Sequence, residues 1–123
     1  MTELKKYNLV YLASPYTQYD LGLSQAFRDI AKIAGALISR GVSVYSPIAH
    51  CHPIAVYGGV HPAAHELWMK IDTKMMAACD ALCIARLPGW DKSAGVAMEA
   101  LEFFSEKKPI YHLEPKTLEV VAA

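Results

Sequence analysis

The sequence at residues 9–15 is LVYLASP, a short apolar run that ends in a serine and a proline. The run from Leu9 to Ala13 contains a valine and a tyrosine, residue types that favour β-strands. Proline has no backbone N–H, so Pro15 cannot continue a hydrogen-bonded ladder. These residues therefore predict a first strand that ends at Ser14.

Outward from this strand, helical and strand-like patterns alternate. Asp20 is a candidate N-cap for a helix whose apolar residues recur at three- and four-residue spacing, and Gly41 ends that helix. The recurring residues are Leu23, Phe27, Ile30, Ala31, Ala34, Leu37 and Ile38. A second strand is expected at 42–45, where Ser46-Pro47 ends it. Residues 48–64 predict a long irregular loop, of the kind that is usually functional.

The second half of the chain continues the alternation. A helix from about His65 leads into a strand at Ala81–Ala85, and a helix at Ala94–Glu106 precedes a last strand at Ile110–Leu113. The tail after Glu114 predicts no element. The apolar lines expected to face the core are Leu67, Ile71, Met75 and Ala78 in the first of these helices, and Ala97, Ala100, Leu101 and Phe104 in the second.

Strands that alternate with helices through short connections predict parallel strands joined by right-handed crossovers. The sequence therefore predicts a single α/β domain over residues 1–123, with a flavodoxin-like or Rossmann-like parallel sheet of four to five strands and helices on both faces. Ligands of such sheets bind outside the carboxyl ends of the strands. The segments expected at those ends are Ser14–Tyr16, Pro47–Gly59 and Arg86–Ser93.

Composition narrows the classes of partner. Lys and Arg number 12, as do Asp and Glu, which leaves no basic footprint for nucleic acid or for an anionic membrane surface. Apolar residues make up 54% of the chain, enough for a packed core, yet no run of about 18 apolar residues predicts a membrane span. Cys51, Cys79 and Cys83 show no CxxC spacing and are expected to be reduced thiols. We therefore expect a cytoplasmic protein with a small-molecule ligand.

Three polar residues are candidates for chemistry. Ser93 begins a predicted helix, where it is either a plain N-cap or a ligand for a phosphate or hydroxyl group. Glu99 shares a helix side with Val96 and Phe103, so that side is expected to face a cleft or a partner chain, unless Glu99 is simply solvated. Asp72 lies on an apolar line, between Trp68 and Met76. It is either a surface carboxylate paired with a neighbouring lysine or a member of a carboxylate pair with Glu99.

Motifs along nearly the whole chain, from Tyr7 to Pro115, bear a family resemblance. They are Tyr11-Leu12-Ala13-Ser14-Pro15-Tyr16, the helix that contains Asp72, and Pro88-Gly89-Trp90-Asp91-Lys92-Ser93 through to Met98-Glu99. In this order they resemble the nucleoside 2-deoxyribosyltransferase superfamily, and within it an uncharacterised branch of unknown function. The resemblance implies N-glycosidic bond cleavage of a nucleoside or nucleoside 5′-monophosphate, by hydrolysis or by 2-deoxyribosyl transfer.

The same resemblance implies roles for individual residues. Glu99 matches the nucleophile that attacks C1′ of the sugar and forms a glycosyl-enzyme intermediate, and Tyr11 matches the tyrosine that orients it. Asp72 matches an acid that holds the sugar or handles the proton on the base. A carboxylate suits this chemistry because departure of the base leaves an oxocarbenium-like sugar. The resemblance implies no cofactor and no metal. It also implies a homodimer or higher homo-oligomer, as do apolar residues that we expect to be exposed on the Asp72 and Glu99 helices, namely Trp68, Met76 and Phe103.

The substrate is expected to contact residues of the same motifs, together with one histidine. These residues are Ser14, Pro15, Tyr16, Trp90, Asp91, Ser93, Gly95 and His52. The chain departs from the transferases at Ser93, where they have an aspartate. Serine there resembles the branch that hydrolyses nucleoside 5′-monophosphates and uses the hydroxyl on the phosphate. Alternatively, Asp91 supplies the missing carboxylate from two residues earlier.

Four histidines and a cysteine lie within residues 50–65, a density that can indicate zinc. No pair among them has a finger-like partner motif, so we expect loop hydrogen bonds or a base contact from His52 or Tyr57 instead of a metal. Two other classes of function remain open on the sequence. One is a non-catalytic module that binds or senses a nucleotide, and the other is a flavodoxin-like electron carrier.

Overall fold

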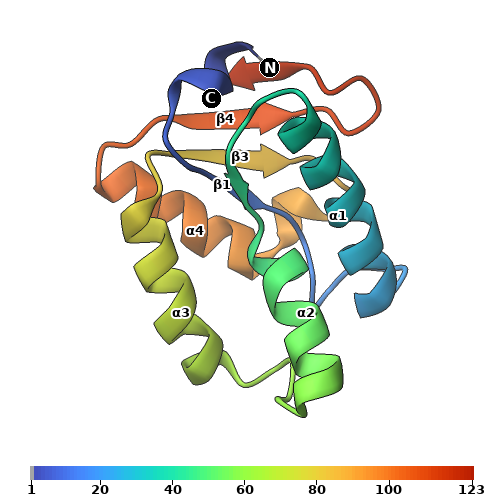
Figure 1. Cartoon of the computed structure of the whole chain (residues 1–123). Helices are drawn as coiled ribbons and strands as arrows, with labels where there is room; N and C mark the ends of the chain where they lie inside the picture. The colour runs from blue at the N-terminus through green and yellow to red at the C-terminus, as the bar shows by residue number, and fades with distance from the viewer. Residues whose placement is uncertain (1) are drawn as a thin grey trace.

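The computed structural model describes residues 2–123 and contains one five-stranded sheet (Figure 1). Its strands are β1 (Val10–Ala13), β2 (Val44–Tyr45), β3 (Ala81–Ala85), β4 (Ile110–Leu113) and β5 (Val120–Ala122), in the spatial order β2-β1-β3-β4-β5. Strands β1 to β4 pair in parallel, and β5 pairs antiparallel with β4. This is the strand order of flavodoxin-like sheets. The predicted α/β fold is therefore confirmed.

Helices cover both faces of the sheet. Successive side chains of β1 point to opposite faces, so each face packs against different helices. On one face Leu12 and Cys83 pack against Ile30 and Leu37 of α1 (Leu23–Ser39). On the other face Tyr11 joins a cluster built from α3 (His65–Ala78) and α4 (Ala94–Ser105). Tyr11 therefore points toward the two helices that contain Asp72 and Glu99. No helix within residues 2–123 is both long and apolar enough to cross a membrane.

The predicted loop at 48–64 is wrong for most of its length, because Pro47–Gly58 forms helix α2. The Ser46 hydroxyl accepts a hydrogen bond from the backbone N–H of Ala49 at 3.2 Å, and Pro47 occupies the start of the helix, where its missing N–H costs nothing. Gly59 ends the helix with a left-handed φ of 72°. Pro53 lies inside the helix, which is why the sequence pattern indicated a loop.

The N-cap of α2 gives a direct test of this assignment. Replacement of Ser46 by alanine is expected to lower the free energy of unfolding by about 1 kcal/mol, because the N–H of Ala49 loses its acceptor. Replacement by aspartate restores an acceptor and should recover most of that loss. Urea denaturation of the three proteins measures the difference, and equal midpoints for all three would contradict the cap.

The predicted buried lines of α3 and α4 are wrong for most of their members, although Met75 and Ala100 do pack partly buried against the core. In α4 the buried residues are Val96, Glu99 and Phe103, whereas Leu101 is 65% exposed and Phe104 74% exposed. In α3 the residues turned inward include Trp68, Asp72 and Met76, whereas Leu67 and Ile71 are exposed. Both helices have apolar residues on more than one side. Packing against Tyr11 and the other side chains of this sheet face therefore determines which side is buried. The acids thus lie on the inner sides of their helices.

Smaller differences occur at the ends of elements. Helix α1 begins after Gly22, which has a φ of 90° and no side chain for a cap, so Asp20 is not its N-cap. The tail after Glu114 adds strand β5, which the sequence did not predict. Two short 3-10 helices, η1 (Thr2–Lys6) and η2 (Trp90–Lys92), complete the fold.

The buried contacts of helix α3 lie mainly at its carboxyl end, while at its amino end Nε1 of Trp68 donates to the carbonyl oxygen of His61 at 3.0 Å. At the carboxyl end Met76 is buried, Cys79 follows in the core, and the Lys108 ammonium donates to the carbonyl oxygens of Met76 at 3.0 Å and Ala77 at 3.2 Å. A cation at a helix C-terminus also interacts favourably with the helix dipole. At the amino end the first three residues, His65 to Leu67, are exposed. The two halves of α3 are therefore held unequally.

Candidate functional site

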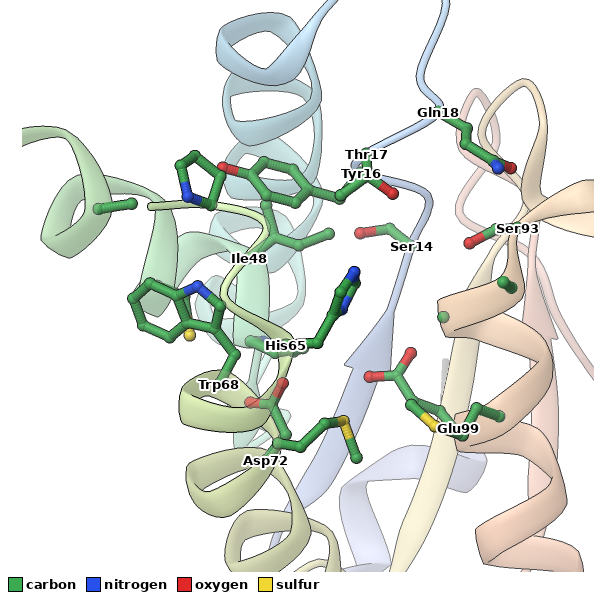
Figure 2. A pocket seen from close by; sticks show the side chains of 18 of the residues that line it. Ser14, Tyr16, Thr17, Gln18, Ile48, His65, Trp68, Asp72, Ser93 and Glu99 are labelled. Carbon is green, nitrogen blue, oxygen red and sulfur yellow. The ribbon is translucent and has the colours of Figure 1, made fainter. Parts of the chain in front are cut away.

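A cavity of about 280 Å³ lies where β1 and β2 end, bounded by α2, α3 and the start of α4 (Figure 2). This is the edge of the sheet at which ligands of such folds bind, and the volume is close to the lower end of the range for small-molecule sites. Six of the residues proposed from the sequence line the cavity. They are Ser14, Tyr16, Asp72, Ser93, Gly95 and Glu99.

Glu99 and Tyr11 form the deepest polar contact at this site. The Tyr11 hydroxyl donates a hydrogen bond to Oε2 of Glu99 at 2.5 Å, although the two residues are 88 positions apart in the sequence. Tyr11 is fully buried in β1, and its ring packs against Tyr45 and Phe103 with centroids 5.8 and 5.6 Å away. Burial, followed by the negative charge of Glu99, raises the pKa of Tyr11 far above its usual value, so its hydroxyl stays a donor. The tyrosine therefore fixes one oxygen of Glu99.

Burial also controls the protonation of Glu99, which is only 9% exposed. Removal from water raises the pKa of Glu99 to about 8, the Tyr11 hydrogen bond acts in the opposite direction, and the charge of Asp72 raises it further. In the free protein at neutral pH, Glu99 consequently holds a proton for most of the time.

Asp72 faces Glu99 across the cavity (Figure 2). Burial raises the pKa of Asp72 to about 6, while the nearby His50 lowers it. Its Oδ1 is buried and has no hydrogen-bond partner among the described residues, which is costly unless a ligand or water supplies one. The two carboxyl groups thus differ in proton affinity, and Glu99 has the higher pKa of the two.

The hydroxyl groups of Ser14 and Ser93 lie above the two carboxyl groups in the view of Figure 2. Ser14 follows β1, and its Oγ is buried with no partner among the described residues. Ser93 is the N-cap of α4 and accepts a hydrogen bond from the N–H of Val96 at 3.2 Å. The start of a helix offers unpaired N–H groups and a positive dipole end. This side of the cavity can therefore bind an anionic or hydroxyl-bearing group.

Other residues proposed from the sequence do not line the cavity. His52 is buried behind Tyr16, whose hydroxyl lies 2.7 Å from its Nδ1, and its ring stacks on Phe27 with centroids 4.8 Å apart. Burial, with a smaller contribution from Arg28, lowers the pKa of His52. His52 therefore contacts a cavity residue, Tyr16, but does not itself line the cavity. Tyr57 is exposed on α2 and does not line the cavity either.

Pro15, Trp90 and Asp91 also lie away from the cavity. Pro15 is fully buried, and Trp90 packs against His112 and beneath the Arg86 guanidinium, with its ring 5.0 Å from that group. Asp91 is exposed in η2. It does not line the cavity, whereas Asp72 does, together with Glu99.

The structure adds residues to the site that the sequence analysis did not assign to it. On α3 these are His65, Trp68 and Met69, which share one side of the helix with Asp72 and Met76. Their positions follow the spacing i, i+3, i+4, i+7 and i+11, the pattern of a single helix side. This pattern would have identified them once Asp72 was placed in a cleft.

No group of three His, Cys, Asp or Glu side chains within residues 2–123 is arranged to hold a metal ion. All three cysteines are free thiols, and Cys79 and Cys83 are buried. Cys51 lines the cavity, where burial, with a contribution from Asp72, raises the pKa of its thiol to about 12. A thiol of that pKa is a weak nucleophile.

Fold and site together define a flavodoxin-like α/β protein with two carboxyl groups, the buried Glu99 and the partly buried Asp72, in a cavity at the ends of its strands. Residues 8–114 match the family described as Domain of unknown function (DUF1937), and the chain belongs to this family. No curated protein matches the sequence.

Proposed function

We propose that this protein binds a nucleoside or nucleoside 5′-monophosphate and cleaves its N-glycosidic bond, with Glu99 as nucleophile. One observation carries the proposal: Glu99 is buried at the wall of the cavity, bonded to the Tyr11 hydroxyl and opposite Asp72. Retaining glycosidases likewise use a carboxylate as the nucleophile, with a second group on the other side of the bond that breaks. The resemblance to nucleoside 2-deoxyribosyltransferases supports the same roles.

In the proposed reaction the ionised Glu99 attacks C1′ as the base departs, and a glycosyl ester forms on its free oxygen. Tyr11 holds the other oxygen and stabilises negative charge on the carboxylate. The positive charge that develops on the sugar favours the ionised form of Glu99, which offsets its raised pKa. Water or a second base then attacks C1′ and releases Glu99, which gives hydrolysis or transfer.

The experiment that tests this function is chromatography of free bases after incubation with a panel of nucleosides and nucleoside 5′-monophosphates. Release of a base by the wild-type protein supports the proposal, and release that requires an added acceptor base identifies a transferase. Absence of base release from every member of the panel would contradict it.

A second candidate function is a non-catalytic module that binds or senses a nucleotide. It is favoured by the raised pKa of Glu99, because a carboxyl group that is protonated at neutral pH donates hydrogen bonds but is a poor nucleophile. Thermal stabilisation by a nucleotide, without release of its base, would select this alternative.

Tyr11 gives a test of the positioning role. Replacement of Tyr11 by phenylalanine removes the donor to Glu99 and is expected to lower kcat/KM for base release by about 10- to 100-fold, the value of one hydrogen bond to a charged group. The control is Tyr7→Phe, which removes a hydroxyl bonded to Tyr111 on the opposite side of the sheet. Equal rates for the two variants would contradict the role of Tyr11.

Ser93 gives a test of phosphate binding. Replacement of Ser93 by alanine is expected to lower kcat/KM for a nucleoside 5′-monophosphate by about 10-fold relative to the free nucleoside, since one hydrogen bond is lost. Ser93→Asp keeps an acceptor for the N–H of Val96 but repels a phosphate, so it separates the capping role from binding. If both variants keep the wild-type preference between the two substrates, Ser93 does not bind phosphate.

We also propose that the protein forms a homodimer or a higher homo-oligomer. Met76 and Phe103, which were expected to be exposed, are buried, and Trp68 lines the cavity. Helices α3 and α4 leave other apolar side chains in water, of which Phe104 and Leu101 are the most exposed. Apolar surface of this kind often marks an interface. Elution at the mass of a 13.5 kDa monomer in size-exclusion chromatography would contradict this proposal.

A further inference from the structure

His65 is a titratable residue of the cavity to which the proposed reaction gives no role. It is the first residue of α3, and its imidazole projects into the cavity between Asp72 and Ser14 (Figure 2). Trp68 and Asp72 follow at i+3 and i+7, so all three belong to the wall that faces Glu99. The imidazole is exposed in the free protein, which leaves it accessible to a ligand.

His65 differs from the other described residues of the cavity wall in the charge that it can carry. The described residues that line the cavity include no lysine and no arginine, so His65 is the one among them whose side chain can carry a positive charge. Burial raises the pKa of both Cys51 and Tyr16, so neither gives up a proton readily. Glu99 is occupied as the nucleophile. The remaining proton donors of the cavity are therefore His65 and Asp72.

The arrangement of the walls places the departing base on the side of His65. C1′ must lie beside Glu99 on α4, and the apolar surface suited to a planar base lies opposite, on Ile48, Trp68 and Met69. His65 precedes Trp68 by three residues and so stands on the same side of α3. Asp72 lies deeper and faces Glu99 directly (Figure 2), which suits it to hold the sugar.

We propose that His65 is a further catalytic residue, the general acid that protonates the departing base. The inference rests on the proposed function. As the bond between C1′ and the base nitrogen breaks, its electron pair stays on the base, and the base takes a proton from the imidazolium. A bond forms between C1′ and an oxygen of Glu99. Water then attacks C1′, its proton passes to the neutral imidazole, and Glu99 leaves as a carboxylate, so both groups return to their starting states.

The test compares His65→Asn with His61→Asn, using two substrates of the wild-type enzyme. His61 is an exposed neighbour that does not line the cavity, and asparagine keeps an acceptor for the N–H of Ala63, which His61 now binds through Nδ1. One substrate is the nucleoside or nucleotide that is cleaved fastest. The other is the p-nitrophenyl glycoside of the same sugar, whose leaving group departs as a stable anion and needs no acid.

For the nucleoside, His65→Asn is expected to lower kcat/KM by about 10²- to 10³-fold, the usual contribution of a general acid. For the p-nitrophenyl glycoside the loss should be less than about 10-fold, because that departure needs no proton. His61→Asn should match the wild type on both. Equal losses on both substrates, or activity of His65→Asn close to the wild type on the nucleoside, would overturn the role of His65 and leave the proposed function standing. If the wild type releases no base from any substrate, both the proposed function and the role of His65 are wrong.

Discussion

Replacement of Glu99 by glutamine is expected to abolish base release, with a loss of about 10⁴-fold or more, as found when a covalent nucleophile is removed. Glutamine has the size of glutamate, and its amide oxygen can still accept the hydrogen bond from the Tyr11 hydroxyl. An amide does not form the glycosyl ester. The substitution therefore removes the chemistry while it keeps the contacts.

The matched control is Glu102→Gln, the same chemical change three residues further along α4 on its exposed side. This variant should release base at the wild-type rate. Binding of a nucleotide, measured by thermal shift, should persist in Glu99→Gln, since the cavity walls are unchanged. If Glu99→Gln releases base as fast as Glu102→Gln does, the nucleophile has been assigned to the wrong residue.

The second large effect concerns stability as a function of pH. Folding raises the pKa of Glu99 from 4.5 to about 8, mainly by burial. Between these values the folded protein keeps a proton that the unfolded chain releases, so the stabilisation is fully present below pH 4.5 and is lost as the pH rises toward 8. Each tenfold change in proton affinity corresponds to about 1.4 kcal/mol, which makes the loss about 5 kcal/mol at most. Asp72, whose pKa is also raised, acts in the same direction.

Glutamine at position 99 cannot ionise, so Glu99→Gln is expected to flatten this slope and to exceed the wild type in stability at pH 8. Denaturant titrations of wild type, Glu99→Gln and Glu102→Gln at several values between pH 5 and pH 8 measure the effect. The informative quantity is the difference between variants at each pH, because other groups titrate alike in all three. Parallel stability curves for wild type and Glu99→Gln would show that burial does not hold a proton on Glu99.

The parts of the fold that could be predicted from the sequence are those with a single strong pattern. Strands β3 and β4 have the expected bounds, because each is a short apolar run between clear turns. Helix α2 was missed because Pro53 and the glycines at its end indicate a loop, while its start signal, Ser46-Pro47, also suits the end of a strand. The faces of α4 were exchanged because both sides have large apolar residues, and only packing against Tyr11 selects one.

The site could be predicted in part for a related reason. The expected position at the strand ends follows from parallel topology, and the cavity lies there. The pairing of Tyr11 with Glu99 was suggested by the family resemblance, since no local pattern connects residues 88 positions apart. His65 and Trp68 could not be recognised before α3 was oriented, because histidine and tryptophan suit many places on a helix surface.

The unequal anchoring of α3 has a geometric consequence for the width of the cleft. The helix is fixed where Lys108 meets its last carbonyl groups, while His65 stands at the opposite tip. The 14 residues of the helix span about 20 Å. A tilt of about 5° about the carboxyl end would move the amino end by about 2 Å, and Asp72, near the middle of the helix, by about 1 Å. The distance from the imidazole to a bound base is thus more sensitive to the angle of this one helix than the spacing of the carboxyl groups is.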